Sequence, residues 1–297
     1  MEERRAAQMK AFGNYHPAVL ITYFLSVLLT AMFASNPVFQ LSALLGGALF
    51  YFFIKKSGKQ TGSVLFYILM FFVITITNPL FSHNGATPLF FINGKAVTLE
   101  AFAYGAGLAA TVIAVLIWFK CLNEIMTSDK ILYLFSKAVP KLSLIVSMSI
   151  KFIPEFISQS KKVSRAQRTM GIYSSDSYAE RVRSRGRVFA SMVSWSLENS
   201  IDTSMSMKSR GYGIKGRTAF SLFKFQRRDL VMLVLCLSLL CITLAGYTEF
   251  YYYPRISRPE QTPLALASYI AFAILSFLPL IIEIREALVW KYCVSKV

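Results

Sequence analysis

Two short phrases combine arginine with glycine in the most basic part of the chain, at residues 166–171 and 207–213. In the second phrase, Gly211 can adopt the left-handed conformation that ends a helix, which places Arg210 in the last turn, where positive charge suits the helix dipole. A guanidinium at a helix tip can bind a carboxylate of another protein through two parallel hydrogen bonds. The alternative is that Arg210 only caps its own helix or contacts lipid phosphate, and the local pattern favours neither reading.

The surrounding residues 161–228 carry fifteen Lys and Arg residues against Asp176, Glu180, Glu198 and Asp202. So large a cationic cluster is too costly to place in hydrocarbon. We therefore expect a cytoplasmic block that contains both phrases.

The rest of the chain has the composition of a membrane protein, because 55% of its 297 residues are hydrophobic and 25 are Phe. A spanning helix needs about 20 apolar residues, with roughly 17 as the lower limit. Six stretches qualify, at residues 18–34, 38–54, 62–81, 101–119, 230–247 and 264–282. We predict an all-α polytopic membrane protein with about six spanning helices. Its expected segments are residues 1–119 with four spans, a cytoplasmic region at 120–228, and residues 229–297 with two spans.

Charge sets the expected orientation. With the N-terminus inside, 29 of the 32 Lys and Arg residues fall on cytoplasmic segments, which leaves Lys95, Arg255 and Arg258 outside. Cytoplasmic loops of membrane proteins are enriched in Lys and Arg. The asymmetry predicts that both termini are cytoplasmic in a multi-pass protein of the cell membrane.

Two long helices are expected inside the cytoplasmic region. Residues 142–157 are apolar, but Lys151, Pro154 and Glu155 interrupt them. We therefore expect a helix that enters or skirts the membrane interface, runs out into the cytoplasm and ends near Gly171.

A second helix is expected to start at about Tyr178 or Arg187 and to end at Arg210. Apolar side chains recur along it at every fourth position and form a stripe, with a ridge of small serines beside it. The stripe consists of Phe189, Val193, Leu197, Ile201 and Met205, and the ridge of Ser196, Ser200 and Ser204. Packing of the stripe against residues 142–157 is the safer interpretation for any single member.

The chemistry of an enzyme is not evident in the sequence. A phosphate-binding G-x4-G-K-[ST] loop is absent, and His16 and His83 are the only histidines, too few for an H-E-x-x-H metal site. The four cysteines form no C-x-x-C pair. We expect no catalytic residue, no metal and no cofactor. Nucleic-acid binding is also disfavoured, because the aromatic residues of the basic block are too scattered to form a stacking platform.

The two phrases, together with residues 151–154 before the first of them, resemble the transmembrane T component of energy-coupling factor transporters, the CbiQ-like family. Proteins of that family carry two short Ala-Arg-Gly-type motifs at the ends of cytoplasmic coupling helices. Ser209, Arg210 and Gly211 match the second motif. The first motif falls on Thr169, Met170 and Gly171, where methionine stands in place of the expected arginine, so that Arg168 or an apolar contact would have to substitute for it.

The resemblance implies a non-enzymatic scaffold that holds two cytoplasmic ATP-binding cassette ATPases and a small membrane-embedded S component that binds a vitamin or a metal ion. It also implies which residues make these contacts. The implied ATPase-docking residues are Arg168, Met170, Gly171, Ser209, Arg210 and Gly211, and the implied S-component contacts are Phe189, Val193, Leu197, Ile201 and Met205. The alternative is a self-contained secondary carrier or channel whose basic block only sets topology and contacts anionic lipid.

Overall fold

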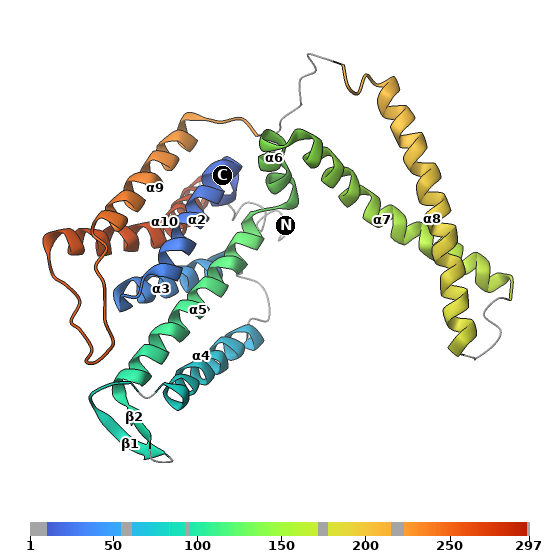
Figure 1. Cartoon of the computed structure of the whole chain (residues 1–297). Helices are drawn as coiled ribbons and strands as arrows, with labels where there is room; N and C mark the ends of the chain where they lie inside the picture. The colour runs from blue at the N-terminus through green and yellow to red at the C-terminus, as the bar shows by residue number, and fades with distance from the viewer. Residues whose placement is uncertain are drawn as a thin grey trace. The chain divides into compact units, whose positions relative to one another are not determined.

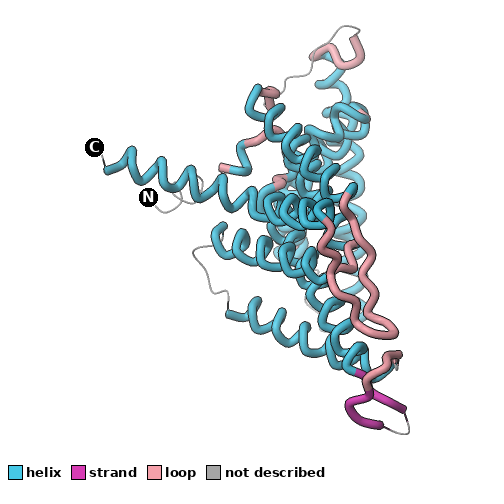
Figure 2. The backbone as a smooth tube through the Cα atoms, turned by 90° about the vertical axis from the view of Figure 1, so that its left-hand side faces the viewer, coloured by secondary structure: helices cyan, strands magenta, loops and turns pink. Residues whose placement is uncertain are grey.

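The computed structural model describes residues 11–54, 61–82, 84–92, 95–171, 178–214 and 223–295. Apart from one small hairpin, the regular structure of these residues is helical (Figures 1 and 2). The first elements in chain order are η1 (Phe12–Asn14), α2 (Pro17–Phe33), α3 (Pro37–Ile54), α4 (Thr61–Phe81), β1 (Pro88–Ile92) and β2 (Lys95–Thr98). They are followed by α5 (Leu99–Ile125), α6 (Ser128–Ala138), α7 (Pro140–Thr169), α8 (Tyr178–Ser209), α9 (Arg227–Ala245) and α10 (Pro263–Ser295).

The predicted class, an all-α polytopic membrane protein, is confirmed. Six helices among the described residues, α3, α4, α5, α7, α9 and α10, are long and apolar enough to cross a membrane. Helices suit this environment because they satisfy their backbone hydrogen bonds internally. The antiparallel β1–β2 hairpin joins α4 to α5 and is drawn in magenta in Figure 2.

The six candidate spanning helices differ from the six predicted stretches in two places. Helix α2 has 17 residues and counts as a shorter apolar helix, whereas α7 qualifies by length and composition. Lys151, Pro154 and Glu155 interrupt the apolar run but not the helix, since α7 continues through Pro154 to Thr169, close to the expected end near Gly171. Proline removes only one backbone donor from this long helix.

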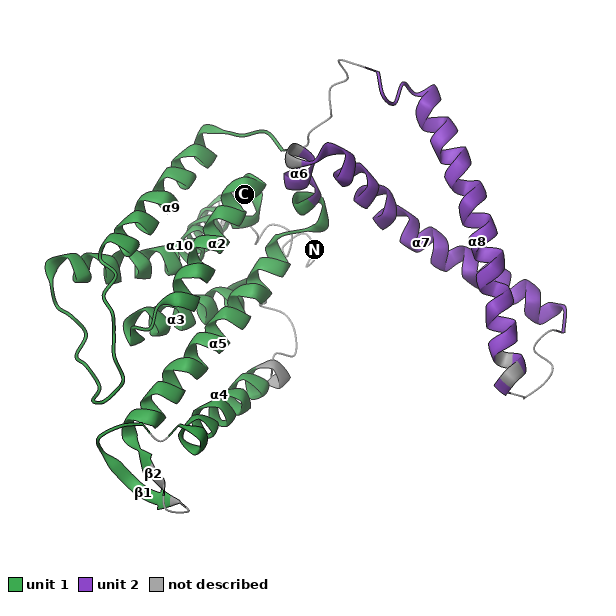
Figure 3. Ribbon diagram, in the orientation of Figure 1, with its two compact units in different colours: residues 1–131, 223–297 green, residues 132–222 purple. Residues whose placement is uncertain are grey.

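The chain divides into two compact units, shown in green and purple in Figure 3. Unit 1 comprises Met1–Ile131 and Phe223–Val297, and unit 2 comprises Leu132–Leu222. Unit 1 therefore contains α2–α5, α9 and α10, and unit 2 contains α7 and α8.

Aromatic side chains form the centre of unit 1. Phe12, Tyr23, Phe24 and Trp118 are fully buried, and the ring centroids of Phe12 and Tyr23 are 5.1 Å apart in an edge-to-face arrangement. The indole Nε1 of Trp118 donates a 2.9 Å hydrogen bond to the carbonyl of Ala43, which satisfies the polar atom of this ring. This cluster joins η1, α2, α3 and α5 into one packed core.

One end of unit 1 gathers segments that are distant in sequence. The backbone N–H of His16, just before α2, donates to the Asp229 carboxylate at the start of α9 over 3.1 Å. The Lys130 ammonium, just beyond α5, donates to the Gly13 carbonyl over 2.7 Å. The start of α2, the start of α9 and the residues that follow α5 therefore lie at the same end.

A second group of connections lies at the opposite end of unit 1. The backbone N–H of Ala86 donates to the Pro254 carbonyl over 3.1 Å, and Asn36 donates through Nδ2 to the Tyr269 hydroxyl over 2.8 Å. The α2–α3 turn, the loop before β1 and the loop between α9 and α10 therefore share this end.

Candidate functional site

The candidate site lies in unit 2, where α7 and α8 cross (Figures 1 and 3). At the crossing the rings of Phe156 and Trp195 meet edge to face with centroids 5.3 Å apart. Met192 is the one apolar side chain that is buried among the described residues of unit 2. The two helices thus share a small contact, and most of their length remains uncovered within the unit.

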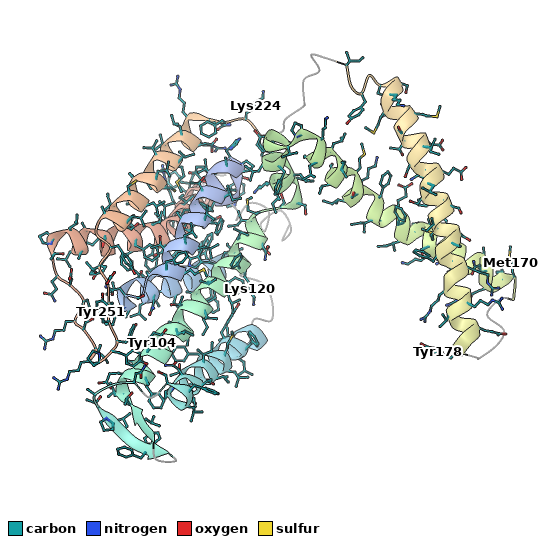
Figure 4. All side chains as sticks on the ribbon, viewed as in Figure 1. Tyr104, Lys120, Met170, Tyr178, Lys224 and Tyr251 are labelled. Atoms are coloured by element: carbon teal, nitrogen blue, oxygen red, sulfur yellow. The ribbon has the colours of Figure 1, made fainter. Side chains whose placement is uncertain are left out.

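Helix α7 ends as the first glycine phrase predicts. Its last helical residue is Thr169, and Gly171 follows with φ +73°, in the left-handed region. The N–H of Gly171 donates to the Arg168 carbonyl over 3.1 Å, which closes the last turn. Met170, which stands where the family motif has arginine, is 74% exposed at this tip (Figure 4).

Helix α8 begins at Tyr178, labelled in Figure 4, and Arg187 lies inside it, so the earlier of the two expected starts is confirmed. The helix therefore has 32 residues.

The end of α8 has the geometry of a Schellman motif. Gly211 has φ +79°, its N–H donates to the Lys208 carbonyl over 3.0 Å, and the Tyr212 N–H donates to the Met207 carbonyl over 3.0 Å. Arg210, directly before this glycine, is exposed. The helix therefore ends at Ser209, one residue before the predicted Arg210, with a guanidinium at its tip.

The two tips are separate surfaces. Each lies about 14 or 15 residues beyond the Phe156–Trp195 contact, roughly 20 Å along its own helix at 1.5 Å per residue. Figure 1 shows the ends of α7 and α8 on different sides of the crossed pair. The structure therefore does not bring Met170 and Arg210 together.

The apolar stripe on α8 is uncovered within unit 2. Its five residues, Phe189, Val193, Leu197, Ile201 and Met205, are between 42% and 71% exposed. The expectation that packing on α7 would cover them was wrong, because α8 meets α7 through Ser184, Met192 and Trp195. Helix α7 is likewise exposed at Leu142, Ile145, Ile150, Ile153 and Ile157.

Sequence reasoning missed a pocket between the two helices. It has a volume of about 530 Å³ and is lined by Ser160, Ser164, Arg168, Arg185, Val188, Phe189 and Met192. The pocket brings together Arg168 and Phe189, which the sequence assigned to two different contacts. The available signal was the repeat of Ser160, Ser164 and Arg168 at every fourth position, which puts three polar side chains on one face of α7.

The fold and the helix ends together define a helical membrane protein with two exposed, glycine-terminated helix tips. No family model matches the chain. Curated relatives do: a stretch of 198 residues is 27% identical to an energy-coupling factor transporter transmembrane protein EcfT of Listeria innocua, covering 62% of this chain and 71% of the relative.

Two further relatives with the same name match shorter stretches. The Lactobacillus helveticus protein is 30% identical over 106 residues, and the Exiguobacterium sibiricum protein is 29% identical over 110 residues. These stretches cover 38% and 42% of the two relatives, so the chain spans about two fifths of their length. The resemblance to the transmembrane component of energy-coupling factor transporters is thereby confirmed at the level of sequence similarity.

Proposed function

We propose that this protein is the transmembrane scaffold subunit of an ATP-driven importer of the energy-coupling factor type. In this role it couples ATP hydrolysis by two cytoplasmic ATPase subunits to the reorientation of a membrane-embedded S component that carries a vitamin or a metal ion. The observation that carries the proposal is the end of α8, where the Schellman turn at Gly211 leaves Arg210 exposed in a chain similar to EcfT proteins.

The distribution of charge in unit 1 supports a cytoplasmic position for both termini. The end that holds His16 and Asp229 also carries Lys130, Arg227 and Arg228 close by in sequence. The loop between α9 and α10, at the opposite end, carries two basic residues, at positions 255 and 258. The positive-inside rule then assigns the first end, and with it the basic region 120–228, to the cytoplasm.

The two helix tips would dock the ATPases in different ways. At the α8 tip, Arg210 binds a carboxylate of one ATPase, with Ser209 and Gly211 giving the partner close access to the backbone. At the α7 tip, Met170 and Gly171 dock through apolar contact, because a thioether side chain adapts to irregular surfaces. Arg168 lies one turn further back on α7 and supports this tip by its charge.

The small contact between α7 and α8 suits a coupling role. When ATP draws the two ATPases together, each coupling helix follows its own ATPase. Few buried apolar side chains hold the pair together, with Met192 the buried one among the described residues of unit 2, so the crossing can change at little free energy. The exposed stripe on α8 then transmits the movement to an S component that rests against it.

The test is affinity purification of the tagged full-length chain from its native membrane in mild detergent. Arg210→Glu places a negative charge at the α8 tip, where it repels the expected carboxylate. Loss of a charge pair at an interface typically costs 2–5 kcal/mol, so we expect at least tenfold less ATPase to co-purify. The matched control is Arg187→Glu, an exposed arginine in the first third of the same helix.

The proposal is supported if two ATPases and a small hydrophobic protein accompany the wild type and the control, and the ATPases are depleted in Arg210→Glu. Undiminished docking and transport in Arg210→Glu would contradict the assigned role. If the chain is isolated alone and transports a solute by itself in vesicles, it is a self-contained carrier or channel instead.

A further inference from the structure

The pocket between α7 and α8 combines basic, hydroxyl and apolar side chains in one place. On α7, Ser160, Ser164 and Arg168 stand four residues apart and share one face of the helix. On α8, Arg185, Val188, Phe189 and Met192 follow the spacing i, i+3, i+4 and i+7, which is again a single face. The pocket thus lies between one face of α7 and one face of α8.

The polar side of the pocket is suited to an anion. Its lining includes two arginines, one from each helix, and no carboxylate among the described residues. Two serine hydroxyls add hydrogen-bond donors. The planar guanidinium of arginine presents several donors that match the geometry of phosphate oxygens. Hydroxyl groups can donate further hydrogen bonds to the same oxygens.

Two polar atoms next to the pocket arginines in sequence are buried without a hydrogen-bond partner in the described part of the chain. Ser184, next to Arg185 in sequence, is 1% exposed, and its Oγ atom has no hydrogen-bond partner within the described part of the chain. The Oε1 atom of Gln167, next to Arg168, is buried and unpartnered in the same sense. Buried polar atoms in proteins are normally paired, and bound polar groups or water commonly supply the partner.

The apolar side of the pocket and its place along α7 indicate where the anion comes from. The exposed apolar residues of α7 end at Ile157, and Ser160 and Ser164 follow at about 5 Å and 10 Å along the helix. A lipid headgroup layer is about 5–7 Å thick on each side of the hydrocarbon core. If the apolar half of α7 lies in hydrocarbon, Ser160 therefore lies within the headgroup layer, and Ser164 lies just beyond it on the cytoplasmic side.

We propose that this pocket binds the phosphate group of an anionic phospholipid. Arg168 and Arg185 bind the phosphate oxygens, and the Ser160 and Ser164 hydroxyls donate to them. Val188, Phe189 and Met192 lie beside the glycerol and the first acyl carbons. A lipid held in this way contacts both helices next to their crossing, and it shares Arg168 with the proposed ATPase-docking tip and Phe189 with the proposed S-component stripe.

The test uses the full-length chain, purified in detergent and stripped of lipid, and native mass spectrometry with added phosphatidylglycerol. Arg185→Gln removes one of the two guanidinium groups, and we expect the tightest lipid-binding event to weaken about tenfold, as the loss of a charge-assisted hydrogen bond predicts. Arg187→Gln is the matched control, because it removes the same charge two residues along α8, on the far side of the helix from Arg185. Its lipid affinity should stay within twofold of the wild type.

Parallel titrations with inorganic phosphate and with phosphatidylcholine identify the source. Retention of phosphatidylglycerol that depends on Arg185, with weaker binding of the other two, supports the proposal. Displacement of the lipid by inorganic phosphate at equal concentration overturns the lipid assignment in favour of a free phosphate ion.

Equal weakening by Arg185→Gln and Arg187→Gln overturns the pocket, since net charge alone then explains binding. A third result overturns it in a different way. If Arg185→Gln leaves the lipid affinity unchanged but reduces the ATPases that co-purify from native membrane, the pocket receives an acidic segment of a partner protein.

Ser164→Ala serves as the second variant, because it leaves the charge unchanged. Its lipid affinity should fall by about threefold, in line with loss of one neutral hydrogen bond.

Discussion

The two units of this protein differ in where their aromatic and aliphatic side chains lie. In unit 1, Phe12, Tyr23 and Trp118 are fully buried, whereas in unit 2 the buried apolar side chain among the described residues is Met192. Side chains that face outward from unit 1 suit lipid, as expected for helices in a bilayer. Unit 2 instead leaves apolar faces on both α7 and α8 that its own packing does not cover, which is typical of a surface that binds lipid or another protein.

The glycines show the same contrast between close and open packing. A Cβ atom added at Gly46 would lie 2.9 Å from both Cβ and the carbonyl oxygen of Ser276, so α3 and α10 of unit 1 approach at their backbones. A Cβ atom added at Gly186 on α8 would meet nothing within 4 Å. Small residues at helix crossings allow close approach in membranes, as Gly46 does in unit 1.

The largest expected effect comes from removing a core aromatic ring. Trp118→Ala deletes a fully buried ring and its hydrogen bond to Ala43, and we expect the free energy of unfolding to fall by about 3 kcal/mol or more. Phe189→Ala on the α8 stripe, where the ring is 71% exposed, should change it by less than about 0.5 kcal/mol. Far-UV circular dichroism during unfolding by sodium dodecyl sulfate in mixed micelles measures both. Similar losses for the two variants would mean that unit 2 packs as tightly as unit 1.

Two glycine-to-alanine changes should have smaller effects on the free energy of unfolding, and the two effects should have opposite signs. Gly46→Ala forces a methyl group against the Ser276 backbone and should destabilise the protein by about 1–3 kcal/mol. Gly186→Ala adds a methyl group in open space inside α8, where alanine is favoured over glycine by up to about 1 kcal/mol. The same unfolding experiment measures the free energy of unfolding of both variants. Loss of helicity in Gly186→Ala would contradict the open surroundings of this residue on α8.

The helix ends of unit 2 could be predicted because their causes are local. Gly171 and Gly211 adopt φ +73° and +79°, and a residue without Cβ enters that region at little cost. Termination of α7 and α8 therefore followed from the glycines without knowledge of any tertiary contact. The spans of unit 1 were predictable for a similar reason, since each needs only a sufficiently long apolar run.

The packing of α8 could not be predicted in the same way. Residues four apart rotate by about 40° per step around a helix, so the five residues of the stripe turn through about 160° and cannot all face one neighbour. Helix α8 faces α7 with Met192, which is buried, and with Trp195, whose ring contacts Phe156 on α7. Nothing in the spacing along α8 identifies that partner, and the pocket beside the contact depends on it as well.

The smallest expected effect on stability comes from the C-terminal half of the α8 stripe, where the side chains are exposed. Ile201→Ser changes a side chain that is 62% exposed, and we expect the unfolding free energy to move by less than about 0.5 kcal/mol. Met192→Ser, on the covered face of the same helix, should cost more because it removes apolar contact with α7.

Binding should rank the same two variants in the reverse order. If the stripe holds the S component, Ile201→Ser lowers the amount of small hydrophobic protein that co-purifies from native membrane, although the folded chain is as stable as the wild type. Retention of that protein by Ile201→Ser, and equally by the double variant with Leu197→Ser, would assign the stripe to lipid. The exposed apolar surface of unit 2 would then belong to the bilayer, and the difference between the units would lie in packing density alone.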